Sequence, residues 1–116
     1  MSHITPAELA LWQAQGFAFT LLDVRRDAAR QQQAASIADA RWLDPAAWLD
    51  WKDGIAAASA AQPTAQPVVL YCAKGHEIGQ GLCAALRAMG VDARYLVGGL
   101  EGWRNDGRPT VPPPAL

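Results

Sequence analysis

Apolar residues along the chain fall into two alternating patterns. Four short segments are apolar or β-prone, as strands of a buried parallel sheet are, and the second of them is the weakest. Between these segments, apolar residues recur at the three- and four-residue spacing of one helix face. The predicted strands are residues 17–24, 37–43, 68–71 and 93–97. Because strands alternate with helices, the pattern predicts an α/β domain with a central, mostly parallel sheet flanked by helices.

Capping signals indicate where the helices begin and end. The sequence Thr-Pro-Ala-Glu at residues 5–8 supplies an N-cap, a first-turn proline and a capping-box glutamate, and Gly16 supplies the end of that helix. Asp44-Pro45 repeats the start signal before a tryptophan-rich segment, in which we favour core packing over a binding platform. Further helices are predicted over residues 27–35, weakly within 54–66 before a loop, over 78–89 and over 100–105.

Length and composition restrict the possible functions. The chain has 116 residues, enough for one domain, and its 51% apolar content supports a core. We assign residues 1–109 to this domain and residues 110–116 to a proline-rich tail. A net charge of −1 gives no basic surface for nucleic acid or a membrane. The amino terminus has no signal-peptide pattern and two cysteines make no disulfide scaffold, so we expect a cytoplasmic protein.

Cys72 is the main candidate for chemistry. It follows the predicted strand at residues 68–71 and precedes a glycine-containing loop and a helix. A thiol in that position meets loop N–H groups and the positive end of a helix dipole, which favour the thiolate and make it a nucleophile. On position alone, a small buried hydrophobic residue that ends a core strand is an equally good interpretation.

Two charged residues are expected near Cys72. Asp23 and Arg25 end the predicted strand at residues 17–24, and the carboxyl ends of parallel strands meet at one edge of the sheet. We favour an ion pair that fixes this edge over a direct role in chemistry. Cys83 is expected to face the core from the helix after the loop, and the histidines and cysteines have no metal-site spacing.

Three motifs resemble, in order and spacing, those of single-domain rhodanese-like sulfurtransferases. They are Asp23-Val24-Arg25, Tyr71-Cys72 followed by Gly75, and the Gly-Gly-Leu-Glu-Gly-Trp sequence at residues 98–103. Residues 36–40, Ser-Ile-Ala-Asp-Ala, also resemble a degraded form of that family's His-Ile-Pro-Gly-Ala element. The resemblance extends from about residue 4 to residue 109 and implies a rhodanese-like fold with a five-stranded, mostly parallel sheet.

The resemblance also implies an activity. Cys72 would accept a sulfane sulfur from a small anionic donor such as thiosulfate or from a persulfide, and would pass it to cyanide, a thiol or a protein acceptor. No cofactor or metal is implied. The loop amides would hold the anionic persulfide, and Asp23 and Arg25 would support the site. The residues expected to bind substrate are Ala73, Lys74, Gly75, His76, Glu77, Ile78 and Gly79.

The loop departs from the family pattern in ways that bear on function. Active members usually carry an arginine or a small hydroxyl residue late in the loop, where this chain has Glu77-Ile78. Glu77 would repel thiosulfate, which favours an organic or protein-bound persulfide as the donor. Cysteine phosphatases and arsenate reductases need a guanidinium at the position of Ile78, so we discount that chemistry. The alternative that remains is a catalytically weak module that binds a partner or senses sulfur or oxidants through Cys72.

Overall fold

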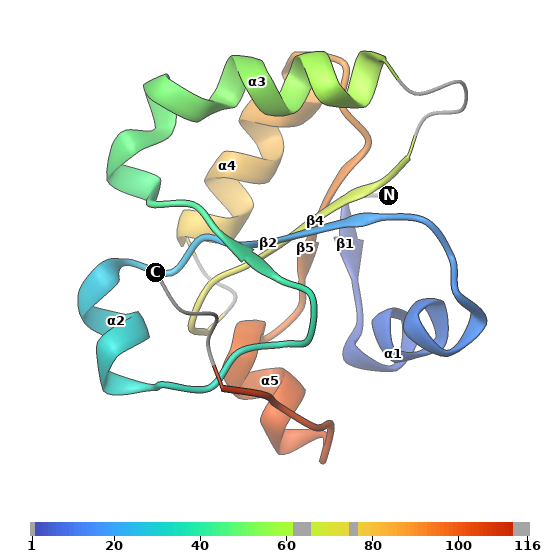
Figure 1. Cartoon of the computed structure of the whole chain (residues 1–116), viewed down its shortest axis with the longest axis vertical. Coiled ribbons are helices and arrows are strands. Elements are labelled where there is room, and N and C mark those ends of the chain that lie inside the picture. Colours follow the sequence, from blue (N-terminus) through green and yellow to red (C-terminus); the bar gives the residue numbers. More distant parts are fainter. Residues whose placement is uncertain (1, 62–65, 75–76, 113–116) are drawn as a thin grey trace.

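The computed structural model describes residues 2–61, 66–74 and 77–112. They form an α/β domain around a sheet whose five strands have the order β1-β5-β4-β2-β3 (Figure 1). Every neighbouring pair of these strands is parallel, which confirms the predicted fold class. The strands are β1 (His3–Ile4), β2 (Thr20–Asp23), β3 (Arg41–Trp42), β4 (Val68–Tyr71) and β5 (Ala93–Leu96).

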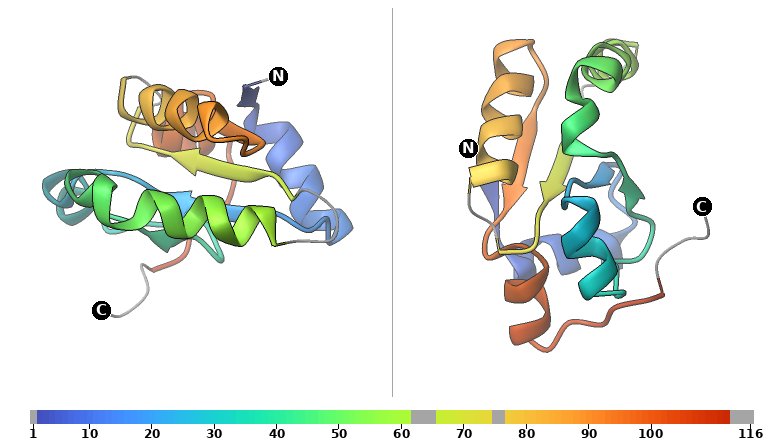
Figure 2. Two further views of the ribbon diagram at one scale, coloured as in Figure 1. Left: turned by 90° about the horizontal axis from the view of Figure 1, so that it is seen from above. Right: turned by 90° about the vertical axis from the view of Figure 1, so that its left-hand side faces the viewer.

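Helices cover both faces of the sheet. Figure 1 shows α3 and α4 on one side of it and α1 and α5 on the other, and Figure 2 shows the same layers from above and from the side. No helix within the described ranges is long and apolar enough to cross a membrane. The helices are α1 (Pro6–Gln15), α2 (Asp27–Gln32), the 3-10 helix η1 (Pro45–Ala47), α3 (Trp48–Ala60), α4 (Glu77–Ala88) and α5 (Gly99–Asn105).

Two apolar clusters fill the space between the layers, and β4 contributes to both. Val69 and Tyr71 pack in the cluster that includes residues of α1 and α5. Val68 and Leu70 point to the opposite face and pack in the cluster that includes residues of α3 and α4. All four side chains are buried. This explains why β4 has an unbroken apolar sequence, since successive strand residues point to opposite faces and both faces are covered.

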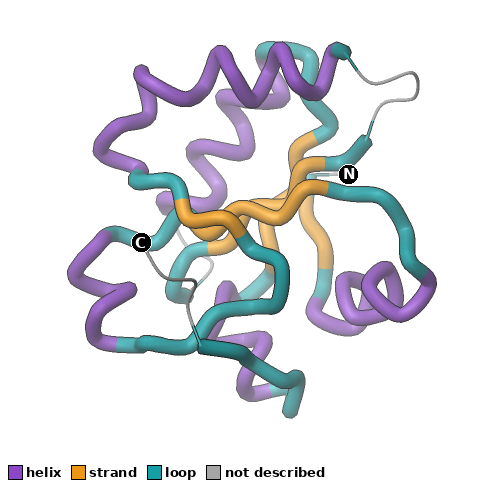
Figure 3. Tube along the Cα trace, in the orientation of Figure 1, coloured by secondary structure: helices purple, strands orange, loops and turns teal. Residues whose placement is uncertain are grey.

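The ends of several elements differ from the sequence prediction. The strand predicted at residues 17–24 begins only at Thr20, because Phe17 and Phe19 instead pack their rings on Trp12. The strand predicted at residues 37–43 is only Arg41–Trp42, since a turn precedes it (Figure 3). β1 was not predicted from the pattern, because two residues are too few to show a period.

The predicted capping of α1 is confirmed in detail. Thr5 accepts a hydrogen bond from the Glu8 amide, the Glu8 side chain accepts one from the Thr5 amide, and Gly16 ends the helix in the left-handed conformation. The segment around Trp48 and Trp51 also behaves as expected. These two rings form an edge-to-face pair with centroids 4.8 Å apart and pack against the core. The weak helix predicted within residues 54–66 is a continuation of α3, which extends to Ala60.

Candidate active site

Cys72 lies at the carboxyl edge of the sheet, directly after β4. Its side chain is 6% exposed and lines a cavity of about 430 Å³. Helix α4 begins at Glu77, five residues further along the chain. The cavity is also lined by Arg25, Arg26, Ala29, Ala73, Lys74 and Ile78. The end of β4, the loop residues Ala73 and Lys74 and the start of α4 therefore lie around the sulfur.

The first turn of α4 passes close to the sulfur. Gly79 is buried, and a Cβ atom added to it would lie 3.5 Å from Cys72 Sγ. That distance is an ordinary van der Waals contact, so a methyl group would occupy the space beside the sulfur. Glycine at this position leaves that space open next to the amino-terminal end of a helix, where N–H groups without a helical partner favour negative charge.

Helix α5 holds the backbone of the cysteine loop from the other side. The Leu100 amide donates a hydrogen bond of 2.9 Å to the Cys72 carbonyl, and the Glu101 amide donates one of 2.9 Å to the Ala73 carbonyl. These donors lie in the first turn of α5, where amides have no partner within the helix. The two loop carbonyls therefore accept hydrogen bonds from these amides, and the bonds hold the backbone of the loop in place.

The glycines of the Gly-Gly-Leu-Glu-Gly-Trp motif have a steric explanation. Gly98 has a φ of +77°, and a Cβ on it would lie 2.9 Å from the Gly102 Cα. A Cβ on Gly102 would lie 3.0 Å from the Val97 carbonyl oxygen. Only residues without a side chain allow this tight connection between β5 and α5. The motif therefore acts on the site indirectly, by placing α5 against the Cys72 loop.

Asp23 and Arg25 form a buried ion pair at the same edge. Arg25 Nη2 lies 2.7 Å from Asp23 Oδ2, and the two side chains are 0% and 3% exposed. Arg25 Nη1 donates to the Gln33 carbonyl at 2.8 Å, and the Trp42 indole donates to the Arg25 carbonyl at 2.9 Å. These contacts agree with the favoured interpretation, a pair that fixes the edge. Arg25 also lines the Cys72 cavity, as predicted for a residue near the thiol.

A second buried network lies under the site and was not predicted. The Tyr71 hydroxyl lies 3.1 Å from Ser36 Oγ and accepts a hydrogen bond of 3.3 Å from the Ile37 amide. Burial, followed by the nearby charge of Asp23, raises the pKa of Tyr71 to about 12. The network joins the residue before Cys72 to the degraded His-Ile-Pro-Gly-Ala element, which gives that element a place in the site.

The structure describes most of the predicted substrate-binding residues. Ala73, Lys74 and Ile78 line the cavity with Cys72, and Gly79 lies beside the sulfur. Glu77 is the first residue of α4, but its side chain falls outside the described part of the chain, as do all of Gly75 and His76. Sequence reasoning missed Arg26 and Ala29. Arg26 directly follows Asp23-Val24-Arg25 and Ala29 lies three residues further along, which was the available signal.

Cys83 lies apart from this cavity, as predicted. It is 1% exposed, packs in the apolar cluster beneath α3 and α4, and donates a weak hydrogen bond of 3.4 Å to the Ser2 carbonyl. Burial raises the pKa of its thiol. Among the described residues, no three histidine, cysteine or acidic side chains are placed to hold a metal ion.

The fold and the cysteine loop together define a class, an α/β domain with a thiol at the carboxyl edge of a parallel sheet. Residues 5–106 match the family of rhodanese-like domains, and the chain belongs to that family. No curated protein matches it significantly.

Solved structures share the fold. A rhodanese-related protein from Thermoplasma volcanium is 22% identical with a TM-score of 0.73, over 96% of this chain and 98% of that one. A thiosulfate sulfurtransferase from Pseudomonas aeruginosa is 24% identical with a TM-score of 0.71, over 99% of this chain and 20% of that one. The Saccharomyces cerevisiae protein Ygr203w, described as a homologue of single-domain rhodanese and of the Cdc25 phosphatase catalytic domain, is 19% identical with a TM-score of 0.70, over 90% of this chain and 80% of that one.

Proposed function

We propose that this protein is a sulfurtransferase that works through a persulfide on Cys72. The Cys72 thiolate attacks the outer sulfur of thiosulfate, a new S–S bond forms, and sulfite leaves with the electron pair of the broken bond. The Cys72 persulfide then gives its outer sulfur to a thiophilic acceptor such as cyanide, which becomes thiocyanate and restores the thiolate. A persulfide donor follows the same steps and releases a thiolate in place of sulfite.

One observation carries this proposal. Cys72 lines a cavity at the sheet edge, beside the first turn of α4, and Gly79 leaves space next to its sulfur. The cavity beside Cys72 has room for the additional sulfur atom of a persulfide. The neighbouring helix start and loop amides supply the fixed dipoles that stabilise its negative charge. Family membership supports the same chemistry.

The charges around the cavity favour an anionic or partly anionic donor. Arg26 and Lys74 line the cavity and are exposed to solvent, so they increase the local concentration of anions. The ion-paired Arg25 adds little net charge, because Asp23 neutralises it. Glu77 is the first residue of α4, and the sequence predicts that its negative charge opposes a compact anion. We therefore expect thiosulfate, a compact dianion, to be a poorer donor than an organic persulfide.

Phosphatase chemistry fits this cavity less well. Ile78 lines it at the position where a cysteine phosphatase needs a guanidinium to bind the oxyanion. A cavity without this guanidinium is better suited to the transfer of a sulfur atom. That reaction needs a nucleophile and stabilising dipoles, but no group that binds three oxygen atoms.

Mass spectrometry of the intact protein tests the proposal. The protein is incubated with thiosulfate or with glutathione persulfide, and each sample is then treated with cyanide. We expect a gain of one sulfur atom on Cys72 that cyanide removes, with faster loading from the persulfide. If neither donor loads Cys72 while its thiol still reacts with an alkylating reagent, transfer from small donors is excluded, and a binding or sensing module becomes the better description.

A further inference from the structure

The Cys72 cavity opens into a second, larger cleft between α2 and α5. The two spaces share Arg25, Ala29, Ala73 and Lys74, so they are parts of one continuous depression. The second part has a volume of about 660 Å³. Beyond the shared residues, it is lined by Gln32, Gln33, Leu100, Glu101, Arg104 and Asn105. We call these six residues, together with Lys74, the polar cleft.

The size of the polar cleft exceeds the needs of an inorganic donor. Thiosulfate is a small tetrahedral anion that fills only the space next to the sulfur of Cys72. Clefts of several hundred Å³ are the size of those that bind drug-sized organic molecules. The depression therefore has room for a donor whose reactive sulfur reaches Cys72 while a larger body lies between the two helices.

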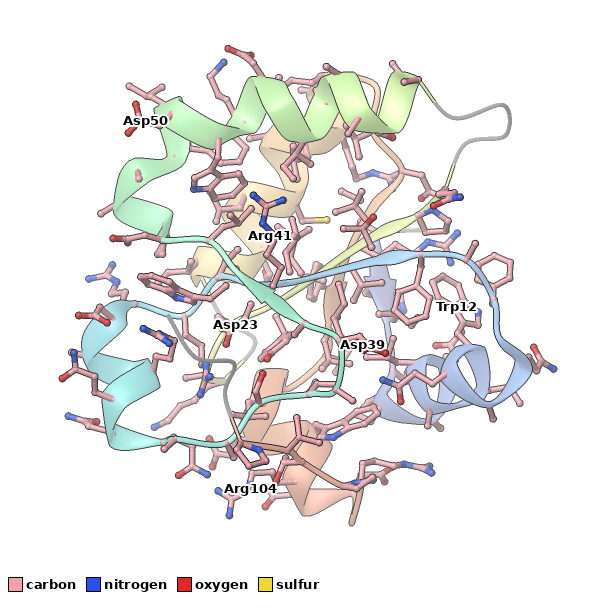
Figure 4. All side chains as sticks on the ribbon, viewed as in Figure 1. Trp12, Asp23, Asp39, Arg41, Asp50 and Arg104 are labelled. Carbon is pink, nitrogen blue, oxygen red and sulfur yellow. The ribbon has the colours of Figure 1, made fainter. Side chains whose placement is uncertain are left out.

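The side chains of the polar cleft indicate what kind of body it would bind. Gln32 and Asn105 are exposed amides, each of which both donates and accepts hydrogen bonds and so matches a peptide group. Lys74 and Arg104 are exposed cations that match carboxylates (Figure 4 labels Arg104 on α5). Glu101 is an exposed carboxylate that matches an ammonium group.

The opposite end of the depression has a different character. The space on the other side of Arg26 and Ile78 is also lined by Asp27, Asp44, Pro45, Ala46, Gly81 and Leu82. Its two carboxylates repel an organic anion, and its other residues offer few hydrogen-bonding groups. Because the two ends differ in this way, we expect the polar part of a donor to bind at the end between α2 and α5.

We infer that the polar cleft binds the body of a low-molecular-weight peptide thiol, and that the persulfide of this thiol is the sulfur donor. This inference rests on the proposed function. The Cys72 thiolate attacks the outer sulfur of the bound persulfide, and a Cys72–sulfur bond forms. The S–S bond of the donor breaks, the peptide thiolate leaves with its electron pair, and solvent then supplies a proton. Amides and cations of the cleft position the donor and take no part in bond breaking.

Loading rates of two persulfides test this inference. Glutathione persulfide carries peptide bonds, carboxylates and an ammonium group, whereas 2-hydroxyethyl persulfide carries none of them. The measured quantity is the ratio of their second-order rate constants for loading Cys72. We expect Arg104→Gln to lower that ratio about five- to tenfold, the effect of losing one charge-assisted hydrogen bond.

Arg41→Gln is the matched control. Arg41 is an exposed arginine on β3 that lines neither part of the depression, so its replacement removes the same charge without changing the cleft (Figure 4). We expect this variant to keep the wild-type ratio. A ratio that falls equally in both variants shows only a general charge effect and overturns the inference, as does a ratio unchanged in Arg104→Gln.

A binding measurement separates this inference from the proposed function. Glutathione is titrated into the Cys72→Ser variant, and the side-chain amide signals of Gln32, Gln33 and Asn105 are followed by NMR. We expect these signals to shift in a saturable manner. If they do not shift although the wild-type protein is loaded by persulfides, the cleft assignment is wrong and sulfur transfer stands. If they shift but no donor loads the wild-type protein, the transfer mechanism is wrong and the cleft remains a peptide-thiol site.

Discussion

The two cysteines of this chain have different surroundings, although both are associated with the same helix, α4. Both residues are buried, with 6% of Cys72 and 1% of Cys83 exposed, and Cys72 lies against α4 whereas Cys83 belongs to it. Cys72 meets the first turn of α4 and lines a cavity. Cys83 lies further along the same helix and packs among apolar side chains. Burial alone therefore does not distinguish the proposed nucleophile from the core thiol; the two differ in access to a cavity and in distance from the start of a helix.

The largest expected difference between the two thiols is in catalysis. Cys72→Ser should lower the rate of sulfur transfer to cyanide by at least about 10³-fold, because a serine hydroxyl is a far weaker nucleophile at neutral pH. Cys83→Ala should keep the rate within about twofold, and its cost, of order 1 kcal/mol, should appear in stability. Steady-state assays and urea unfolding of both variants measure these effects. An active Cys72→Ser variant would remove the basis for the comparison.

The ion pair near each thiol should also contribute differently to the free energy of unfolding. Arg25→Met leaves the Asp23 carboxylate buried without its cation, and we expect a loss of about 3–5 kcal/mol in the free energy of unfolding. Arg87→Met, near Cys83, breaks a half-exposed pair with Asp92 at 3.7 Å and a 3.0 Å hydrogen bond to the Ala93 carbonyl, and should cost only about 1–2 kcal/mol. Urea unfolding at pH 7 measures both. Equal losses would show that the Asp23–Arg25 pair is no more important than an exposed one.

High pH should weaken the network next to Cys72. Tyr71 has a pKa of about 12 in the folded protein against an ordinary value of 10.0, so below pH 10 both states keep the phenol proton. Between pH 10 and 12 only the unfolded state loses it, and stability should fall by about 2–3 kcal/mol. Tyr71→Phe should lose stability at pH 7, because the bonds to Ser36 and Ile37 are gone, but should lack this fall.

Urea unfolding at pH 8, 10 and 11.5 separates these effects. The raised pKa of Cys83 contributes a decrease of the same sign, so the Tyr71 contribution is the difference between the wild type and Tyr71→Phe. Parallel pH profiles of the two proteins would contradict the assignment to Tyr71.

The contrast between the thiols also shows what the sequence can predict. The position of Cys72 was predictable, because a strand that is apolar at every position must be buried and its last residue must reach the sheet edge. The Asp23–Arg25 pair followed from the same reasoning. The network of Tyr71 with Ser36 was not predictable, because its residues are 35 positions apart and no sequence pattern pairs the two side chains. The cleft lined by residues of α2 and α5 was missed because these two helices come to face each other only in the fold.

The smallest expected effect concerns the element that holds Ser36. Asp39 has a φ of 67° and is the one described residue other than glycine with a positive φ. It lies in a turn closed by a 3.1 Å hydrogen bond from the Ala40 amide to the Ile37 carbonyl, where the resembled family element has glycine. Asp39→Gly should raise the free energy of unfolding by about 0.5–1 kcal/mol, because glycine adopts this conformation without steric cost.

Ala38→Gly is the matched control for this turn. Ala38 is also exposed and has no positive φ, so glycine there only increases the entropy of the unfolded chain and should cost about 0.5 kcal/mol. Urea unfolding of the two variants should therefore give shifts of opposite sign. If Asp39→Gly is also destabilising, the aspartate side chain contributes more to the turn than its backbone strain costs. Residues 36–40 would then differ from the family sequence and still stabilise the position of Tyr71, the residue before Cys72.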